Sequence, residues 1–246
     1  RLNATEEKMV IDRQARVTRW KISAALLACA CLMPDARALQ LAANSRTSYV
    51  IALAGDASIP DRTAAAELVE YLRKATGAEF AVVTPEQVAG RPAIAVGAGA
   101  SALKLGPDAN TLAPEEWIVR TSRQDLCLVG GGPRGTLYAV YHFLEDVLGV
   151  HWWTPWEETV PLRPVLEIGS PNLRGRPTFR YRDIYMLYGH DDGRFAARNR
   201  LNREGDSPIT STYGGTLAYG PPYHVHTFSM YFPPKEHVAA HPEWFS

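Results

Sequence analysis

Residues 125–155 constrain the fold most, because they combine an apolar run, a glycine-rich turn and an amphipathic helix. The helix is predicted from large apolar residues at three- and four-residue spacing, which gathers them on one face. They are Leu137, Val140, Tyr141, Leu144, Val147 and Leu148. Pro133 suits a first helical turn and Gly149 a left-handed stop. Residues 126–129 predict a buried strand before the helix, and residues 150–153 a second after it. We therefore expect a strand–helix–strand unit in a domain core.

The same stretch contains a glycine motif with two interpretations. Gly130, Gly132 and Gly135 match G-x-G-x-x-G between a strand and a helix, as in dinucleotide sites. A helix N-terminus offers N–H groups to phosphate, and Arg134 could bind an anion there or cover the turn. However, the acid expected at the end of the next strand is missing, since residues 152–154 are Trp-Trp-Thr. We favour close helix–strand packing and keep a nucleotide-binding enzyme as the weaker alternative.

The composition excludes some partners and suggests others. The chain has 246 residues, enough for one or two domains, and its 26 basic and 26 acidic side chains balance. No overall field therefore favours nucleic acid or an acidic membrane surface. Tryptophan, tyrosine and proline concentrate after residue 150, and flat aromatic surfaces suit either core packing or stacking on sugars.

The N-terminus has the features of an export signal. Basic residues at positions 13–21 precede an apolar run at 22–33, and Ala36-Arg37-Ala38 has the small-x-small form of a cleavage site. We predict a signal peptide cleaved after Ala38, with Met9 as the start, and a periplasmic or extracellular protein. The run is short for a bilayer span. A lipid anchor and a buried N-terminal helix are the alternatives.

The remaining pattern predicts a mixed sheet. Strands are expected at residues 48–54, 80–83, 93–96, 117–121 and 165–168, with 117–129 forming a hairpin. A helix should begin at an Asp61 cap and stop at Gly77. The order β-α-β-β-β-β-α-β predicts a two-layer α/β domain over residues 46–168, with the helices on one face. Residues 169–177, rich in Gly, Pro and Arg, are predicted to be a linker.

Six segments carry a resemblance to known proteins. They are GGGPRGTLYAVYHFLEDVLGVHWWTP, DRTAAAELVEYLRKATGAEF, FRYRDIY, RNRLN, HTF and PPKEHVAAHPEWFS. The first two resemble the N-terminal domain of the α-glucuronidases of glycoside hydrolase family 67. The others resemble the catalytic-type region of a related, largely uncharacterised family of secreted bacterial proteins that share this domain. The resemblance covers roughly residues 48–246, and its motifs are long but mainly structural.

This resemblance implies an accessory domain followed by a (β/α)8 barrel. Residues 178–187 would form the first barrel strand, residues 194–202 part of its helix, and residues 178–246 the start of a truncated barrel domain. The implied function is an N-terminal fragment of an exported glycoside hydrolase-like protein acting on polysaccharide, including polysaccharide that carries uronic acid. Glycoside hydrolysis needs two carboxyl groups. In related barrels they come from later strands, so we expect them beyond Ser246 and assign no catalytic residue. A noncatalytic carbohydrate-binding protein is the alternative.

Five residues are the candidate substrate-binding residues. They are Arg182, Asp183, Asn199, Asn202 and His226. Arginine binds carboxylates in a bidentate manner, so Arg182, with Arg180 alongside, suits a uronate, while Asp183 suits sugar hydroxyls. An ion pair at a domain interface is the alternative for these residues, and a solvated helix face for the asparagines. His226 is selected on the resemblance alone.

Histidine spacing raises the question of a metal. His224 and His226 would share one side of a strand, and His237 and His241 stand four residues apart. Pro242 limits that second helix, and the glutamate of an H-E-x-x-H motif is missing. We therefore predict no metal site and no cofactor. Cys127 is predicted to be a small core residue rather than a nucleophile.

Overall fold

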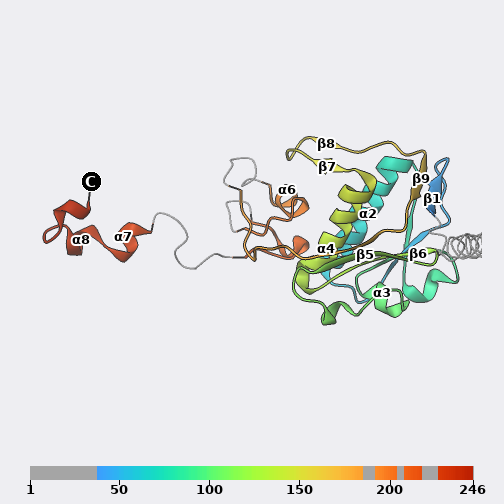
Figure 1. Ribbon diagram of the computed structural model, residues 1–246, viewed down its shortest axis with the longest axis horizontal. Helices are drawn as coiled ribbons and strands as arrows, with labels where there is room; N and C mark the ends of the chain where they lie inside the picture. The colour runs from blue at the N-terminus through green and yellow to red at the C-terminus, as the bar shows by residue number, and fades with distance from the viewer. Residues whose placement is uncertain (1–37, 185–191, 204–207, 218–226, 246) are drawn as a thin grey trace, which may run out of the picture. The chain divides into compact units, whose positions relative to one another are not determined.

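The structure is a computed structural model that describes residues 38–184, 192–203, 208–217 and 227–245 (Figure 1). The chain divides into two compact units, Arg1–Arg37 and Ala38–Ser246, and every described residue belongs to the second. The predicted signal peptide, apart from Ala38, therefore lies outside the described residues. No helix among the described residues is long and apolar enough to cross a membrane.

The described residues contain a mixed six-stranded sheet in the order β10-β5-β6-β4-β2-β3. Its strands are β2 (Val50–Leu53), β3 (Ala81–Val83), β4 (Ala93–Val96), β5 (Trp117–Ser122), β6 (Asp125–Gly130) and β10 (Asn172–Gly175). Strands β3, β2, β4 and β6 are parallel, whereas β5 and β10 run antiparallel to their neighbours. Every residue of β2 and β4 is buried, as expected for parallel strands covered on both faces. The predicted mixed α/β architecture and its hairpin are confirmed.

Two long helices cover one face of the sheet (Figure 1). They are α2 (Ile59–Thr76) and α4 (Gly132–His142), and a π-helical segment (Phe143–Leu148) continues α4 to Gly149, whose φ is 83°. Helix α2 ends at Gly77 as predicted, but its cap is Ser58, not Asp61. The Ser58 hydroxyl accepts a hydrogen bond from the Asp61 N–H (3.2 Å), so Asp61 lies inside the first turn. The predicted apolar face of α4 and its π-helical continuation is buried in the main core, except for the half-buried Val147.

Short elements cover the opposite face, where the sequence predicts no helix. They are α3 (Ala98–Ala102) and the 3-10 turns η1 (Pro85–Val88) and η2 (Ala109–Thr111). A small cluster rich in alanine and valine lies beneath them, and it includes the buried Cys127. Burial raises the pKa of that thiol to about 11, so it stays protonated. The prediction of helices on one face therefore holds for the two long helices but not for α3.

Two small antiparallel pairs flank the main sheet. Strand β1 (Leu39–Ala43) pairs with β9 (Val165–Ile168), and β7 (His151–Trp152) pairs with β8 (Glu158–Thr159). The sequence predicts that the domain starts at residue 46, but strand β1 shows that it starts earlier. Strand β10 lies within the predicted linker and pairs with β5 at the sheet edge. Its side chains are only exposed or half-buried, which explains why it lacks an apolar signature.

The described residues after β10 contain short helices and turns. They include α6 (Gly193–Arg198), η4 (Ser211–Tyr213), α7 (Phe228–Tyr231), α8 (Pro234–His237) and η5 (Pro242–Trp244). Residues 178–184 form no strand, and residues 185–187 of the predicted strand lie outside the described residues. The Arg182 N–H donates to the Asn202 side chain (2.9 Å), and the Arg182 carbonyl accepts from the Asn202 N–H (3.2 Å). Both groups are therefore occupied by a loop rather than by a neighbouring strand.

The glycine motif allows the start of α4 to pack closely on the sheet. A Cβ added at Gly130 would lie 2.1 Å from the Gly135 carbonyl carbon, which no side chain tolerates. The Gly131 N–H donates to the Glu116 carbonyl (2.9 Å), and a Cβ at Gly214 would lie 2.8 Å from the Pro133 carbonyl oxygen. Neighbouring backbone therefore surrounds this turn, which favours the packing interpretation over a phosphate cradle.

We expect the substitution Leu144→Ala to lower the free energy of unfolding by about 2–5 kcal/mol, because it leaves a cavity in the main core. Leu144 is fully buried, whereas Leu162 is 81% exposed, so Leu162→Ala is a control with the same chemical change. Urea denaturation measures both. Equal effects of the two substitutions would contradict the assignment of this helix face to the core.

Candidate functional site

A buried carboxylate, Glu115, lies at the centre of the most connected polar cluster near the predicted site residues. Its side chain accepts hydrogen bonds from Arg134 Nε (2.7 Å), Arg182 Nη1 (2.9 Å) and Asn202 Nδ2 (3.0 Å). The residue itself has a φ of 62°, a left-handed conformation that non-glycine residues seldom adopt. Its N–H donates to the Gly131 carbonyl (3.0 Å), which holds the backbone in this conformation.

Three parts of the chain position these groups. Glu115 lies in the loop that leads into β5. Arg134 and Tyr138 stand four residues apart on α4 and so share one side of that helix. Arg182 and Asn202 come from the segment after β10 and bind each other. Arg182 Nη2 also donates to the Tyr138 hydroxyl (2.7 Å), and its Nε donates to the Arg200 carbonyl (2.7 Å). Residues far apart in sequence are thereby fixed around one carboxylate.

The electrostatics of the cluster keep Glu115 ionised. Burial favours its neutral form, but the hydrogen bonds from Arg182, Arg134 and Asn202 outweigh burial and hold its pKa below the ordinary value. Burial, with the nearby Glu115 charge, raises the pKa of Tyr138 to about 12, so the phenol remains protonated. A general acid needs a raised carboxyl pKa. Glu115 is therefore suited to holding arginines in place rather than to donating a proton.

A cavity of about 630 Å³, which we call the arginine groove, opens beside this cluster. Its lining residues are Pro114, Glu115, Arg134, Arg176, Pro177, Thr178, Arg180 and Leu217. This described lining contains three guanidinium groups and one carboxylate, and Arg176 and Arg180 are exposed. Arg134 is fixed by Glu115 and by the carbonyls of Gly214 and Gly215 (both 3.0 Å). The excess of positive charge favours an anionic ligand.

The structure brings two of the five predicted site residues together. Arg182 and Asn202 meet at Glu115, and Asn202 is fully buried, so both build the wall behind the groove rather than line it. Asp183 accepts from the Tyr181 hydroxyl (3.2 Å), and its Oδ1 lies 3.6 Å from Arg203 Nε. Asn199 Nδ2 donates to the Phe195 carbonyl (3.1 Å) at the end of α6.

His226, the fifth predicted residue, lies outside the described residues, and so does His224. Among the described residues, no group of three or more His, Cys, Asp or Glu side chains is arranged to hold a metal ion. His241 instead stacks on Trp244, with ring centroids 3.9 Å apart, and its Nδ1 lies 3.1 Å from Glu243.

Sequence reasoning missed Glu115 and Arg176. It noted Arg180 only beside Arg182, and it gave Arg134 two interpretations, binding an anion or covering the turn. The sequence signal for Glu115 is weak, because Pro114-Glu115-Glu116 has the composition of a solvated turn. Arg176 belongs to a stretch predicted to be a linker. Only the folded chain shows that these residues share one cavity.

Comparison with known proteins gives one similarity. Residues 152–246 match a family described as a domain of unknown function (DUF4838). This match covers α6 and the other elements of the segment after β10, but not α2 or α4. A search of curated proteins found no match.

We expect Glu115→Gln to lower the free energy of unfolding by about 3–5 kcal/mol, because it removes the counter-charge from two largely buried arginines. Glu79→Gln is the control, since the Glu79 side chain is 77% exposed and lies 3.9 Å from Arg73. An exposed pair of this kind contributes about 0–1 kcal/mol. Chemical denaturation at neutral pH compares the two variants. Similar small losses in both would show that the Glu115 contacts are not structural.

The lowered pKa of Glu115 also predicts a pH dependence. The contribution of Glu115 to stability is present above its ordinary pKa of 4.5 and is lost as the pH falls through the folded-state pKa. The unfolding free energy of the unmodified chain should therefore fall more steeply with acidification than that of Glu115→Gln. Glu70, Glu116 and Glu158 also have lowered pKa values, so the difference between the two curves, not either curve alone, is the measured quantity. If the unfolding free energies of the two proteins fell in parallel with pH, the lowered pKa of Glu115 would be contradicted.

Proposed function

We propose that this chain is the N-terminal part of an exported glycoside hydrolase-like protein, α-glucuronidase-like in its relationships, that acts on polysaccharide carrying uronic acid. We further propose that the arginine groove binds the acidic sugar. Two lines of argument support this. The sequence resembles the N-terminal domain of the family 67 α-glucuronidases, and the groove has the charge that a uronate requires.

The arginine groove is the observation that carries the proposal. A uronic acid differs from its neutral sugar by one carboxylate, and a guanidinium can bind that group through two parallel N–H donors. Arg176 and Arg180 line the groove with exposed side chains, while Arg134 is held in the lining by its hydrogen bond to Glu115. The volume of about 630 Å³ falls within the range of about 300–1,000 Å³ that is usual for small-molecule sites.

The described residues are better suited to binding a sugar than to hydrolysing a glycosidic bond. Glycoside hydrolysis uses a pair of carboxyls, one of them protonated at working pH through a raised pKa. Within the described part of the chain, the carboxyls with a resolved shift all have lowered pKa values. They are Glu70, Glu86, Glu115, Glu116 and Glu158. These five carboxyls are ionised rather than poised to donate a proton. The second candidate function, a noncatalytic carbohydrate-binding protein, needs only the arginine groove.

We expect the full chain to bind D-glucuronic acid and aldotetraouronic acid more tightly than glucose in isothermal titration calorimetry. Arg176→Gln and Arg180→Gln should each weaken the affinity for the acidic sugars about 10- to 100-fold, because each removes charge-assisted hydrogen bonds. Arg163→Gln is the matched control, since Arg163 is an exposed arginine outside the groove lining. Equal affinity for glucuronic acid and glucose would contradict the proposal, as would equal losses in all three variants.

A second assay separates the two candidate functions. Release of glucuronic acid from glucuronoxylan oligosaccharides by the full chain would support the hydrolase. Binding without release would support a binding role for the chain itself. Neither outcome alters the prediction for the arginine variants, because that prediction concerns affinity alone.

A further inference from the structure

We infer that the arginine groove binds two neighbouring uronic acids of one polysaccharide chain, with a separate arginine for each carboxylate. This inference rests on the proposed function and deepens it, because it names the substrate class as polysaccharide with consecutive uronic acids rather than with single acidic side groups. Three properties of the groove carry it, namely its unpaired positive charge, the fixed backbone beneath its two exposed arginines, and its volume.

The one carboxylate in the lining does not oppose an anionic ligand. That carboxylate, Glu115, already accepts hydrogen bonds from Arg134 Nε (2.7 Å) and from Arg182 Nη1 (2.9 Å). Two guanidinium groups therefore neutralise it, and only one of them, that of Arg134, belongs to the lining. The remaining charge of the described lining is the positive charge of its two exposed arginines.

Those two arginines, Arg176 and Arg180, have free guanidinium groups. Among the described residues, no side chain forms a hydrogen bond or an ion pair with either guanidinium. Glu116 is influenced by the charge of Arg176, but it is bound by Arg174 Nε (2.7 Å) and does not line the groove. Each of the two cations is therefore available for one carboxylate of a ligand.

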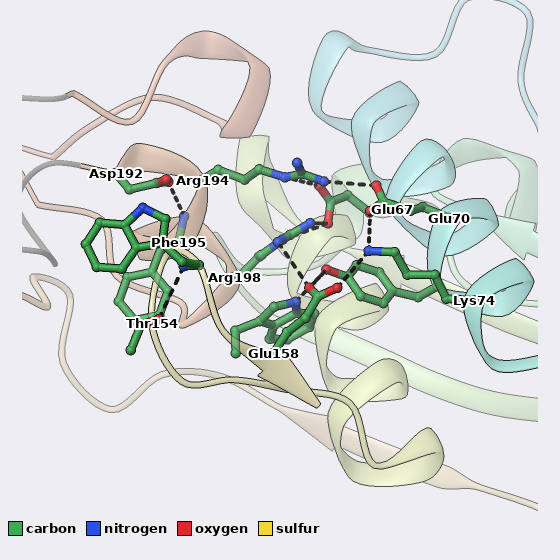
Figure 2. Close-up of polar contacts among 12 residues, drawn as sticks. Glu67, Glu70, Lys74, Thr154, Glu158, Asp192, Arg194, Phe195 and Arg198 are labelled. Atoms are coloured by element: carbon green, nitrogen blue, oxygen red, sulfur yellow. Dashed lines mark hydrogen bonds and ion pairs between the residues drawn. The ribbon is translucent and has the colours of Figure 1, made fainter. Parts of the chain in front are cut away.

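A second cavity of the protein shows the opposite arrangement. It has a volume of about 260 Å³, and its described lining carries three cations and three carboxylates from α2, α6 and the β7–β8 hairpin. Lys74 Nζ lies 2.7 Å from both Glu70 Oε1 and Glu158 Oε1. Arg194 Nη2 lies 2.9 Å from the other oxygen of Glu70, as Figure 2 shows. Charged groups in that cavity bind one another, whereas the exposed arginines of the arginine groove are left for a ligand.

The backbone beneath the two exposed arginines is fixed at separate points. The Arg180 carbonyl accepts hydrogen bonds from Asn202 Nδ2 (2.7 Å) and from Arg182 Nη1 (3.3 Å). Arg176 directly follows Gly175, the last residue of β10, which pairs with β5. The two side chains thus start from different fixed positions on the wall of the groove. This arrangement suits two carboxylates on neighbouring sugar rings better than one carboxylate on a single ring.

The volume of the groove agrees with a ligand of two rings. It measures about 630 Å³, within the range of about 300–1,000 Å³ that is usual for drug-sized ligands, and two linked sugars are of that size. A single uronic acid would leave one free guanidinium without a counter-charge. Consecutive uronic acids carry their carboxylates on adjacent rings, so that one segment of the polymer supplies both. Once the first carboxylate is bound, the second binds from the same molecule, which raises the affinity.

The test is calorimetric titration of the full chain with digalacturonic, diglucuronic and dimannuronic acid. The matched ligand is an aldobiouronic acid, which has two sugar rings but only one carboxylate. We expect at least one diuronic acid to bind about tenfold or more tightly than the aldobiouronic acid, because its second carboxylate meets the second arginine. Raising the salt concentration from about 50 mM to about 500 mM should reduce this advantage, since both arginines are exposed to screening.

Variants of the two arginines assign the advantage to the groove. Arg176→Gln and Arg180→Gln should each remove the advantage of the diuronic acid, because one free arginine then remains for two carboxylates. In the double variant, the fold-losses of the two single variants should multiply for the diuronic acid, since contacts to different carboxylates are independent. Arg163→Gln, an exposed arginine outside the groove lining, should retain the advantage. An unchanged urea midpoint confirms that each variant is folded.

Two outcomes would overturn this inference while leaving the proposed function standing. One is binding of glucuronic acid together with equal affinities for the diuronic acids and the aldobiouronic acid. The other is an advantage of the diuronic acid that Arg163→Gln reduces as much as Arg176→Gln does. If no acidic sugar binds at all, the proposed function itself is contradicted, and this inference with it.

Discussion

The buried ion pairs of Glu115 are the interaction on which the candidate site depends. A carboxylate with a 9% exposed side chain is costly to desolvate, and hydrogen bonds from two arginines, an asparagine and the Tyr138 hydroxyl offset that cost. The same contacts join the loop before β5, the first turns of α4 and the segment after β10. Glu115 therefore fixes the position of Arg134 in the arginine groove, while Arg176 and Arg180 supply the rest of the positive charge of its lining. Arg134 stays in position because its Nε donates a hydrogen bond to the fixed Glu115 carboxylate.

Glu67 repeats this arrangement on α2. It binds Arg194 and Arg198 of α6, just as Glu115 binds Arg182. The segment after β10 is thus attached to the sheet domain by arginines that reach buried carboxylates, with Phe195 as an apolar contribution to the main core. Each attachment lies beside a cavity, but the two cavities differ in charge. One has an excess of arginine, whereas the cations and carboxylates that line the other are equal in number.

The elements with strong local periodicity could be predicted from the sequence. Helix α4, its glycine stop and the β5–β6 hairpin follow directly from apolar spacing and turn residues. Strand β10 and helix α3 could not, because one is a polar edge strand and the other is only five residues long. The site was predictable only in part. Arg182 and Asn202 are conspicuous in sequence, but their partner Glu115 lies 67 residues before Arg182, and no local pattern indicates that it is buried.

Whether the arginine groove holds the carboxylate of an acidic sugar is tested most directly by a structure of the complex. We would determine the crystal structure of the full chain with aldotetraouronic acid. We expect the uronate carboxylate to lie within hydrogen-bonding distance of the Arg176 or Arg180 guanidinium, with Glu115 still bound to Arg134 and Arg182. An acidic sugar bound elsewhere, or one whose carboxylate points into solvent in the arginine groove, would contradict it.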